Sequence, residues 1–476
     1  MTKLTILQIN DTHSYLELHN EHFYGADGIE VRPAGGYARL KSLVEDIRRD
    51  HEHVLLFDNG DTIHGTYDAV QSKGWNMVPV LKHMAFDAMT FHWDSAYTPA
   101  NLKEISEAVG YPVLALNVYD KQTDERVFEP YMIRQVGGLK VGILGLAANF
   151  IDKMMPDSFH EGVYFTLGEE ELPGLIEEVK MQGAELLILL SHNGFNQDIQ
   201  LMKDVDGIDI CLSSHTHNRI FEPVYVGDTV VIQSGSHGSF LGRIELEFDT
   251  TIKSLRHELI EIVPEIEEDE AMKALVDDAL AEHRDKLSEE VGCTKDTLHR
   301  ATSLSATMDD MLLEAMLQAS GAQIAFSNGW RYGVPIPPGQ ITLRDLYQII
   351  PMDPPLRLTE MTGQEIRDMI EENLEATYSC DPHEQKGGYV KRMRGLTVYI
   401  KIENPCQLRV QQILVGDTEL ALDETYQVVY VTKQGVPFDK YGQKHRDSDI
   451  TAVQAMRELL KGDCYQAAGR PSVIVI

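Results

Sequence analysis

The sequence predicts an α/β protein that carries a second mixed domain, and two patterns support this. Short apolar runs typical of buried strands recur through the first half of the chain, at residues 4–9, 54–57, 141–146, 186–190 and 208–212. An apolar stripe at helical spacing lies between the first two runs, on Leu40, Leu43, Val44 and Ile47. A strand, a helix and a strand in this order are typical of a layered α/β fold.

Polar segments begin where four of these runs stop. They are Asn10–His13, Asp58–Asp61, Ser191–Gly194 and Ser213–Asn218. The carboxyl ends of strands are where α/β folds collect their ligand groups. We therefore expect the functional site at this end of the predicted sheet.

The pattern changes in the second half. Residues 264–291 are strongly acidic, with apolar residues at roughly helical spacing, and predict a linker helix. Beyond them, helical patterns at 308–317 and 363–374 alternate with strand-like runs at 396–402 and 426–431, as in an α+β domain. We therefore divide the chain into a first domain at 1–262, a linker helix at 263–295 and a second domain at 296–476.

Composition excludes several classes of function. The 476 residues are 43% hydrophobic and 25% charged, the balance of a folded globular protein rather than a disordered one. With 42 Lys and Arg against 75 Asp and Glu, the formal charge is −33. Such a charge repels nucleic acid and anionic membrane surfaces, so neither is expected as a partner. A small phosphate or sulfonate ester would need a local positive centre, which metal ions can supply.

The cysteines and the N-terminus indicate a compartment. The five cysteines are scattered and odd in number, so the sequence predicts neither a disulfide framework nor a zinc knuckle and suits a reducing compartment. The N-terminal residues alternate as in a strand and show no signal-peptide pattern. The densest apolar run, 186–190, is far below the ~20 residues of a membrane span. We expect a cytoplasmic protein with no membrane segment; the sequence does not predict its oligomeric state.

Aspartates and histidines in the polar segments predict a metal centre. Asp11/His13 and His215/His217 have i, i+2 spacing, which puts both side chains of a pair on the same side of an extended segment. One such histidine alone is more often a hydrogen-bonded core residue, but four segments at strand ends form a ligand set. The mixed nitrogen and oxygen donors suit Mn²⁺, Fe, Zn²⁺ or Co²⁺ better than Ca²⁺. Asp61, after a glycine, is the carboxylate best placed to bridge two ions about 3.5–4 Å apart.

These segments resemble, in order, the blocks of the calcineurin-like metallophosphoesterase domain: Asp11-Thr-His13, Gly60-Asp61, Ser191-His192 and His215-Thr-His217. Together with the second half of the chain they resemble the 5'-nucleotidase family. Further matching segments lie at residues 35–40, 238–243 and 341–347. The resemblance implies a four-layer α-β-β-α metallophosphoesterase domain, an α+β C-terminal substrate domain and two divalent metal ions, with manganese favoured.

The chain departs from the family in one block. Where the family has Gly-Asn-His followed by an acid, this chain reads Phe91-His92-Trp93-Asp94. Either His92 is the catalytic histidine and Phe91 replaces a ligand, or His92 replaces the ligand asparagine and Trp93 replaces the catalytic histidine. The first alignment leaves a hydrophobe facing a cation, so we prefer the second. The His-Trp pair resembles the SoxB branch of the family, which removes a sulfonate from a cysteine-linked thiosulfonate with two manganese ions.

The resemblance implies a role for each residue of this centre. His92, Trp93 and Asp94 form its catalytic block. Because tryptophan cannot deliver a proton, its presence favours substrates with acidic leaving groups. His237, near the last block, is a candidate for the missing acid. The first metal is expected on Asp11, His13, Asp61 and His217, and the second on Asp61, His92, His192 and His215.

Anion-binding and stacking residues are expected in the second domain. Arg331 and Arg392 lie in segments similar to SoxB and are candidates to clamp a phosphate or sulfonate bidentately, assisted by Asn328. Tyr389 and Phe438 are candidates to stack on a base. The glycine-rich segment that anchors a base-stacking aromatic residue in nucleotide-binding members is absent near the end of this chain.

The sequence thus predicts a dinuclear metal-dependent hydrolase of phosphate esters, with nucleotides as the first-choice substrates, of the 5'-nucleotidase or cyclic-nucleotide phosphodiesterase type. Two alternatives stay open. One is a SoxB-like hydrolase of thiosulfonates or activated esters. The other is an inactive module that keeps the metal ions only to bind a ligand.

Overall fold

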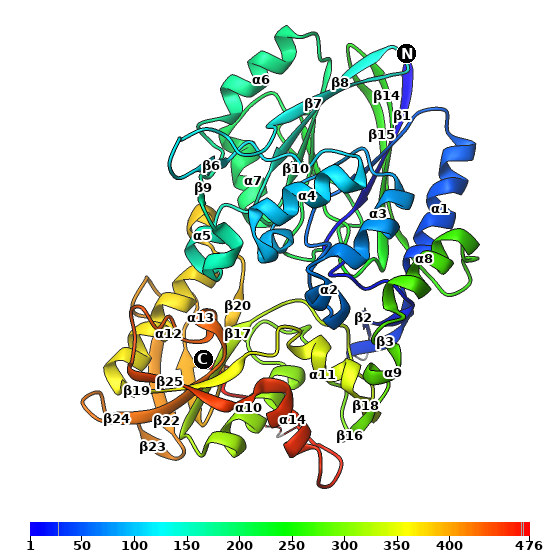
Figure 1. The fold of residues 1–476 in the computed structure, drawn as a ribbon. Helices are drawn as coiled ribbons and strands as arrows, with labels where there is room; N and C mark the ends of the chain where they lie inside the picture. The colour runs from blue at the N-terminus through cyan, green and yellow to red at the C-terminus, as the bar shows by residue number, and fades with distance from the viewer. Residues whose placement is uncertain (27, 468, 470) are drawn as a thin grey trace. The chain divides into compact units, whose positions relative to one another are not determined.

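The computed structural model describes residues 1–26, 28–467, 469 and 471–476, and it separates into two compact units (Figure 1). Unit 1 contains residues 1–19 and 33–282, and unit 2 contains residues 20–32 and 283–476. Residues 20–32 therefore group with unit 2, although they lie inside the first predicted domain. The domain boundaries at 262 and 295 stay a prediction.

Two β-sheets form the centre of unit 1. The first has the order β15-β14-β1-β4-β5, in which β1, β4 and β5 are parallel. The second has the order β12-β13-β11-β10-β8-β7, and its four inner strands are parallel. The strands are β1 (Thr2–Ile9), β4 (Val54–Asp58), β5 (Ala88–Met89), β14 (Phe240–Asp249) and β15 (Thr251–Glu261), then β7 (Tyr131–Val136), β8 (Leu139–Leu146), β10 (Leu186–Ser191), β11 (Ile210–Leu212), β12 (Val224–Val226) and β13 (Thr229–Ile232). A small separate pair joins β6 (Val118–Asp120) to β9 (Val163–Phe165).

Alternation along β10 explains why the strands read as unbroken apolar runs. Leu186, Ile188 and Leu190 belong to the core between the two sheets, whereas Leu187 and Leu189 pack on the opposite face, under helices. Because both faces of the sheet are covered, nearly every position along the strand is apolar. All five predicted strand runs coincide with strands of the two sheets, which confirms the α/β prediction.

Helices cover the outer faces and complete the four predicted layers. Helices α6 (Leu172–Met181) and α7 (Phe195–Asp204) contribute to the core on the outer face of the second sheet. Helix α1 (Tyr37–Asp50) lies on the other side of the unit (Figure 1). It carries the predicted stripe, of which Leu40, Val44 and Ile47 are buried. Helix α8 (Glu270–Leu280) packs against α1, so part of the predicted linker covers unit 1. The remaining helices are α2 (Tyr67–Ser72), η1 (Trp75–Met77), α3 (Val78–Met84), η2 (Trp93–Tyr97), α4 (Pro99–Val109), α5 (Ile151–Met154) and η3 (Asp157–His160).

Unit 2 is a mixed α+β unit, as predicted. Its larger sheet has the order β20-β17-β24-β19-β25 and its smaller sheet the order β23-β22-β21-β26. Helix α12 (Gly363–Tyr378) begins at a capping box and buries its apolar face in the core of the unit. The strands are β2 (His19–Gly25), β3 (Gly28–Ala34), β16 (Glu290–Thr294), β17 (Ile324–Gly329), β18 (Gly339–Thr342), β19 (Pro355–Thr362), β20 (Tyr389–Arg394), β21 (Leu396–Ile400), β22 (Val410–Val415), β23 (Thr418–Glu419), β24 (Thr425–Tyr430), β25 (Gln443–Thr451) and β26 (Val473–Val475). The other helices are α9 (Arg284–Leu287), α10 (Thr307–Ser320), α11 (Leu343–Ile349), η4 (Pro382–Glu384), α13 (Thr432–Gly435) and α14 (Ala452–Leu459).

The prediction of no disulfide is wrong. Cys293, on β16, is bonded to Cys464, and the two Cα atoms lie 4.6 Å apart. The partners are 171 residues apart in the sequence, so no short Cys spacing signals the pair. Cys211, Cys380 and Cys406 are free. None of the helices in the described residues has the length and apolar character needed to cross a membrane.

Candidate metal centre

The polar segments at the strand ends meet in unit 1 and form two adjacent groups. Within each group, one ligand atom of every residue lies within 4.8 Å of those of the others. The loops after β1, β4, β5, β10 and β11 supply them, as expected for the carboxyl edge of parallel strands. The first group is Asp11, His13 and His217; the second is Asp61, His92, His192 and His215.

The two aspartates hold the groups together. The Nε2 atom of His192 lies 3.6 Å from Oδ1 of Asp11 and 3.4 Å from Oδ2 of Asp61. Asp61 also lies 3.2 Å from Nδ1 of His92, in its own group, and 3.8 Å from Nε2 of His13, in the other. A carboxylate that faces imidazoles of both groups is in the position of a bridging ligand.

The backbone at the site is in an uncommon conformation. Five of the seven grouped residues have positive φ angles, between 48° and 69°, in the left-handed region that costs a residue with a Cβ atom of order 1–3 kcal/mol. Such conformations cluster at ligand sites, where surrounding hydrogen bonds hold them. These residues are Asp11, His13, Asp61, His215 and His217.

Backbone carbonyls fix the orientation of two imidazoles. Nδ1 of His192 donates to the carbonyl of Asn59 at 2.5 Å, and Nδ1 of His13 donates to the carbonyl of His64 at 3.3 Å. Each ring therefore turns its Nε2 toward the centre of the site, the arrangement found in metal-binding histidines; a metal ion would displace any proton on that nitrogen. Among the residues described, Asp11 Oδ1, His92 Nε2 and His192 Nε2 are buried without a hydrogen bond. Buried oxygen and nitrogen atoms without a hydrogen bond have lone pairs that a divalent cation could bind.

The electrostatics of the site also favour positive charge. Burial works to raise the pKa of Asp61, but His92 and His192 hold it well below its usual value. Burial works to lower the pKa of His192, but Asp61 and Asp11 raise it to about 9. Burial lowers the pKa of His13 to about 3, which leaves its ring neutral and able to ligate. Two buried carboxylates thus create a negative potential that a proton or a metal cation can neutralise.

The block that departs from the family lies against this centre. His92 is a member of the second group, whereas Phe91 is buried against the ring of Phe128 at a centroid distance of 4.9 Å. This is the geometry that the second alignment requires. The backbone N–H of Trp93 donates to Oδ1 of Asp61 at 2.7 Å, and its indole ring lies edge-on to His13 at 5.5 Å.

Asp94 contacts backbone rather than the interior of the site. Its carboxylate accepts the N–H groups of Asp61 and Thr62, both at 2.8 Å, and of Ile63 at 2.9 Å. The N–H of His92 also points to it, at 3.3 Å. Asp94 therefore fixes the loop that carries Asp61.

Two further histidines lie beside the first group. His237 donates its backbone N–H to the carbonyl of Asp11 at 2.8 Å, and its ring lies 5.7 Å from that of His217. Sequence reasoning did not select His64, whose Nδ1 lies 2.7 Å from the hydroxyl of Tyr97 and whose ring lies 5.2 Å from that of Trp93. His64 falls three residues after Asp61 in the same loop, and no pattern in the sequence distinguishes it from a core residue.

Arg392 in unit 2 differs from the expectation. It is 2% exposed; its Nε donates to Asp309 at 2.9 Å, and its two terminal nitrogens donate to the carbonyls of Ser303 and Thr302 at 3.0 and 2.8 Å. Arg300 bonds the other oxygen of Asp309 at 2.8 Å. Every nitrogen of Arg392 thus has a protein partner, and this argues against its predicted role in clamping an anion.

The other predicted substrate residues also belong to unit 2. Arg331 lies over the ring of Tyr389, with its guanidinium carbon 4.5 Å from the ring centroid. Asn328, on β17, is partly exposed. Phe438 is 39% exposed, and Arg357 lies over its ring at 4.6 Å. The arginine covers one face of this ring.

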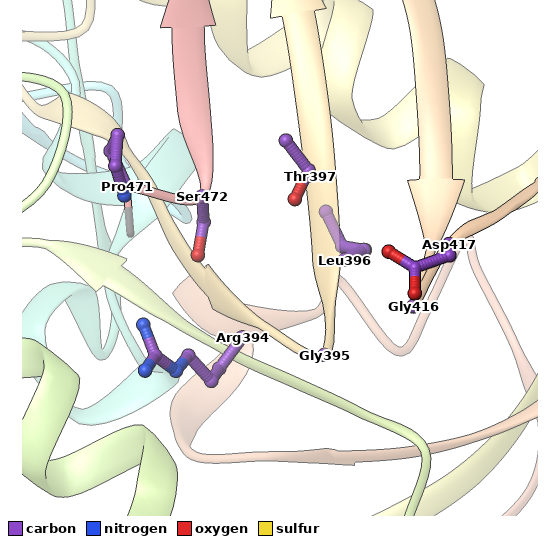
Figure 2. Close-up of a pocket in the computed structure, with 8 residues that line it drawn as sticks. All are labelled: Arg394, Gly395, Leu396, Thr397, Gly416, Asp417, Pro471 and Ser472. Carbon is purple, nitrogen blue, oxygen red and sulfur yellow. The ribbon is translucent and has the colours of Figure 1, made fainter. Parts of the chain in front are cut away.

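Two pockets lie within single units and contain none of the candidate residues. One, of about 740 Å³, lies in unit 1 where β1 and β4 begin, at the opposite end of these strands from the metal centre. The other, of about 220 Å³, lies in unit 2 between the start of β21, the β22–β23 turn and the segment before β26 (Figure 2). Its one arginine, Arg394, pairs with Glu314 at 2.5 Å. Neither pocket competes with the metal centre as the candidate site.

Comparisons with known proteins agree with this geometry. The calcineurin-like phosphoesterase family matches residues 4–219, and the 5'-nucleotidase C-terminal domain matches residues 288–433. The chain is 25% identical to the trifunctional nucleotide phosphoesterase protein YfkN of Bacillus subtilis (strain 168) over 92% of its own length. It spans only 32% of that longer protein.

Two solved structures show the same fold over nearly the whole chain. The sulfate thiohydrolase SoxB of Thermus thermophilus has a TM-score of 0.91 at 24% identity, covering 99% of this chain and 96% of that one. A 5'-nucleotidase precursor, also from Thermus thermophilus, has a TM-score of 0.88 at 22% identity, covering 100% and 99%. With a calcineurin-like phosphoesterase domain followed by a 5'-nucleotidase C-terminal domain, the chain belongs to the 5'-nucleotidase family of metallophosphoesterases.

Proposed function

We propose that this metallophosphoesterase hydrolyses phosphate esters of nucleotides at a centre of two divalent ions. The observation that carries the proposal is the pair of adjacent ligand groups joined through Asp61. Asp11, His13, Asp61 and His217 would hold one ion, and Asp61, His92, His192 and His215 would hold the other. The match to a nucleotide phosphoesterase supports the substrate class.

Metal ions at this centre would lower the pKa of a water molecule and polarise the phosphoryl group. The mixed imidazole nitrogen and carboxylate oxygen donors suit Mn²⁺, Fe, Zn²⁺ or Co²⁺, and manganese is the first choice among them from the resemblance to the SoxB branch. The residues of this chain provide the orientation. His13 and His192 are held in the ligating tautomer by carbonyls, and Asp94 is a positioning residue for the loop of Asp61.

In unit 2, Arg331, Asn328, Tyr389 and Phe438 are the residues proposed to contact the substrate. Arg331 supplies the guanidinium group for the phosphate in place of the buried Arg392. Tyr389 or the open face of Phe438 would stack on the base.

A second candidate function rests on Trp93. Its indole N–H donates but cannot deliver a proton to a departing alkoxide, whereas a thiolate or phenolate leaves without one. On this basis the enzyme would prefer activated esters or thiosulfonates, and the likeness in fold to SoxB is compatible with that choice.

The test is hydrolysis by the manganese-loaded protein of AMP, p-nitrophenyl phosphate and S-sulfocysteine, with and without a chelator. Release of phosphate from AMP at a rate similar to that from the aryl ester supports the nucleotide proposal. Turnover restricted to p-nitrophenyl phosphate or S-sulfocysteine supports the second candidate. Tight manganese binding with no turnover of any substrate would overturn both and leave a metal-dependent binding module.

The cytoplasmic location stays a prediction. A disulfide between Cys293 and Cys464 is more typical of oxidising compartments. Thiol labelling with and without reductant tests whether the disulfide forms in the cell, and detection of the protein after cell fractionation tests which compartment it occupies.

A further inference from the structure

The turn between β11 and β12 carries one ligand for each proposed ion. His215 belongs to the second group and His217 to the first, only two residues apart. Both have positive φ angles, 69° and 57°, so the turn is held in a conformation that these residues rarely adopt on their own. Whatever holds this turn therefore controls both metal positions.

A single buried amide, that of Gln233, holds this turn from both sides. Gln233 follows β13 and is 0% exposed. Its Nε2 donates to the carbonyl of Ser214 at 2.5 Å, just before His215, and to Oγ of Ser213 at 3.1 Å. Its Oε1 accepts from Oγ1 of Thr216 at 3.1 Å, between the two histidines, and from the N–H of Asn218, just after His217.

These four hydrogen bonds use the whole capacity of the side chain. A primary amide has two N–H donors and two lone pairs on its oxygen, and here each has a partner. Asparagine is the only other residue type with such an amide, and its side chain is one methylene shorter. Glutamate of the same shape lacks the donors and would place an oxygen against the carbonyl of Ser214.

The same amide is linked through Ser213 and Asp198 to Ser191, the residue before the ligand His192. Ser213, which accepts from Gln233, donates to Oδ2 of Asp198 at 2.5 Å. The other oxygen of Asp198 accepts from Oγ of Ser191 at 2.6 Å, and Ser191 immediately precedes His192. The hydrogen-bond chain from Gln233 therefore ends beside a ligand on the neighbouring strand.

We propose that Gln233 is a positioning residue that sets the affinity of both metal positions together. The inference rests on the proposed function, because it requires that His215 and His217 ligate. Partners that orient metal ligands typically affect metal affinity by about 10- to 100-fold when they are changed. Loss of Gln233 is expected to lower the affinity for both ions by this factor, because the turn would relax away from its positive φ angles.

The experiment measures binding of Mn²⁺ to the metal-free full-length protein by electron paramagnetic resonance of the free ion. The variants are Gln233→Glu, which keeps the shape, and Gln233→Leu, which removes all four hydrogen bonds. The matched control is Asn117→Asp. Asn117 is also 0% exposed, and its amide bonds the backbone of Ala147 and Thr166, neither of which is a proposed metal ligand. Thermal unfolding of each metal-free protein is measured in parallel.

The expected result is two weakened Mn²⁺ sites in both Gln233 variants and two intact sites in the control, even if all three variants melt at a similarly lower temperature. Gln233 variants that melt early but bind both ions as the wild type does would overturn the inference, as would weakening of only one site. Should Gln233→Leu fail to fold, Gln233→Glu decides. A wild-type protein that binds no Mn²⁺ would instead overturn the proposed function itself.

Discussion

Buried charge is accommodated differently in the two units of this protein. In unit 1, the buried carboxylates of Asp11 and Asp61 face several imidazoles at 3.2–3.8 Å, on a backbone with positive φ angles. In unit 2, the buried carboxylate of Asp309 lies between Arg300 and Arg392, at 2.8 and 2.9 Å, and the arginines also bond carbonyls. In the first cluster several ligand atoms have no hydrogen bond. In the second, the charged groups are hydrogen-bonded to other protein groups.

This difference distinguishes a ligand-binding cluster from one that stabilises the fold. Open buried atoms on a conformationally costly backbone are tolerated where a ligand completes the bonding. A cluster whose charges are paired by protein groups is complete as it stands and contributes to the fold. The distinction predicts that changes in the cluster around Asp11 and Asp61 act on metal binding and catalysis. Changes in the cluster around Asp309 are predicted to act on stability.

The largest expected effect is that of Asp61→Asn. The change keeps the shape of the residue but removes the charge that faces both ligand groups. Because the metal ions are expected to supply several kcal/mol of transition-state stabilisation, kcat/KM for a phosphate ester should fall by about 10³-fold or more. The bound metal per chain should fall with it, as measured by elemental analysis.

Asp209→Asn is the matched control for that experiment. Asp209 is a half-buried carboxylate that accepts the N–H of Leu187 at 2.8 Å, near the start of the strands that carry the ligands. It should keep full activity and metal content. Equal losses in the two variants would show that the effect of Asp61 is one of folding and would contradict the bridging role.

Asp309→Ala should have the opposite profile. Removing the shared carboxylate leaves two buried guanidinium groups without a counter-charge, which is expected to cost about 3–5 kcal/mol of unfolding free energy. Urea denaturation measures this loss, and Asp309→Asn, which retains an acceptor, should lose less. Mn²⁺ binding by the folded fraction should be unchanged. Loss of metal affinity in these variants would break the distinction between the units.

The metal centre could be anticipated from the sequence because its ligands come directly after the predicted strands. Parallel strands bring their carboxyl ends to one edge, so Asp11, His192 and His215 needed only the apolar runs before them to be grouped. His92 was placed by excluding an apolar ligand. These inferences used short-range pattern and simple chemistry.

Arg392 and the disulfide could not be anticipated in the same way. Four consecutive residues of β20, including Lys391 and Arg392, are buried, although charged residues at these positions are more typical of a surface strand. The partners that neutralise or bond them lie far away in the sequence: Asp309 is 83 residues from Arg392, and Cys464 is 171 residues from Cys293. Pairing at that separation depends on the tertiary fold, and a short sequence pattern does not predict it.

The disulfide is a further difference between the units. It closes a long loop of unit 2, so the double variant Cys293→Ser, Cys464→Ser is expected to lose about 2–5 kcal/mol of stability. The measurement is thermal or urea unfolding, with Cys380→Ser as a control at an exposed free cysteine. Metal binding by unit 1 should be the same in all three proteins. A control variant as unstable as the double variant would contradict the assignment.

The smallest effect for a single step, a change of one pH unit, concerns Lys391, which adjoins Arg392 on β20. In the part of unit 2 that is described, Lys391 has no carboxylate bonded to it. Its Nζ donates to the carbonyls of Gln434 and Gly435 at 2.5 and 2.8 Å, and burial lowers its pKa to about 7. In an unfolded chain the pKa is about 10.4. Between these values the unfolded protein binds one more proton than the folded one, so the free energy of unfolding should rise with pH.

The rise is at most about 1.4 kcal/mol per pH unit between pH 7 and 10, and it should disappear below pH 7, where both states are protonated. Urea unfolding of the wild type and of Lys391→Met at pH 6, 7, 8 and 9 isolates it, because all other titrating groups are common to the two proteins. The difference in stability between them should grow with pH in favour of the wild type. A difference that stays constant from pH 7 to 9 would show that Lys391 keeps its proton. An unpaired buried lysine would then behave like the paired arginine beside it.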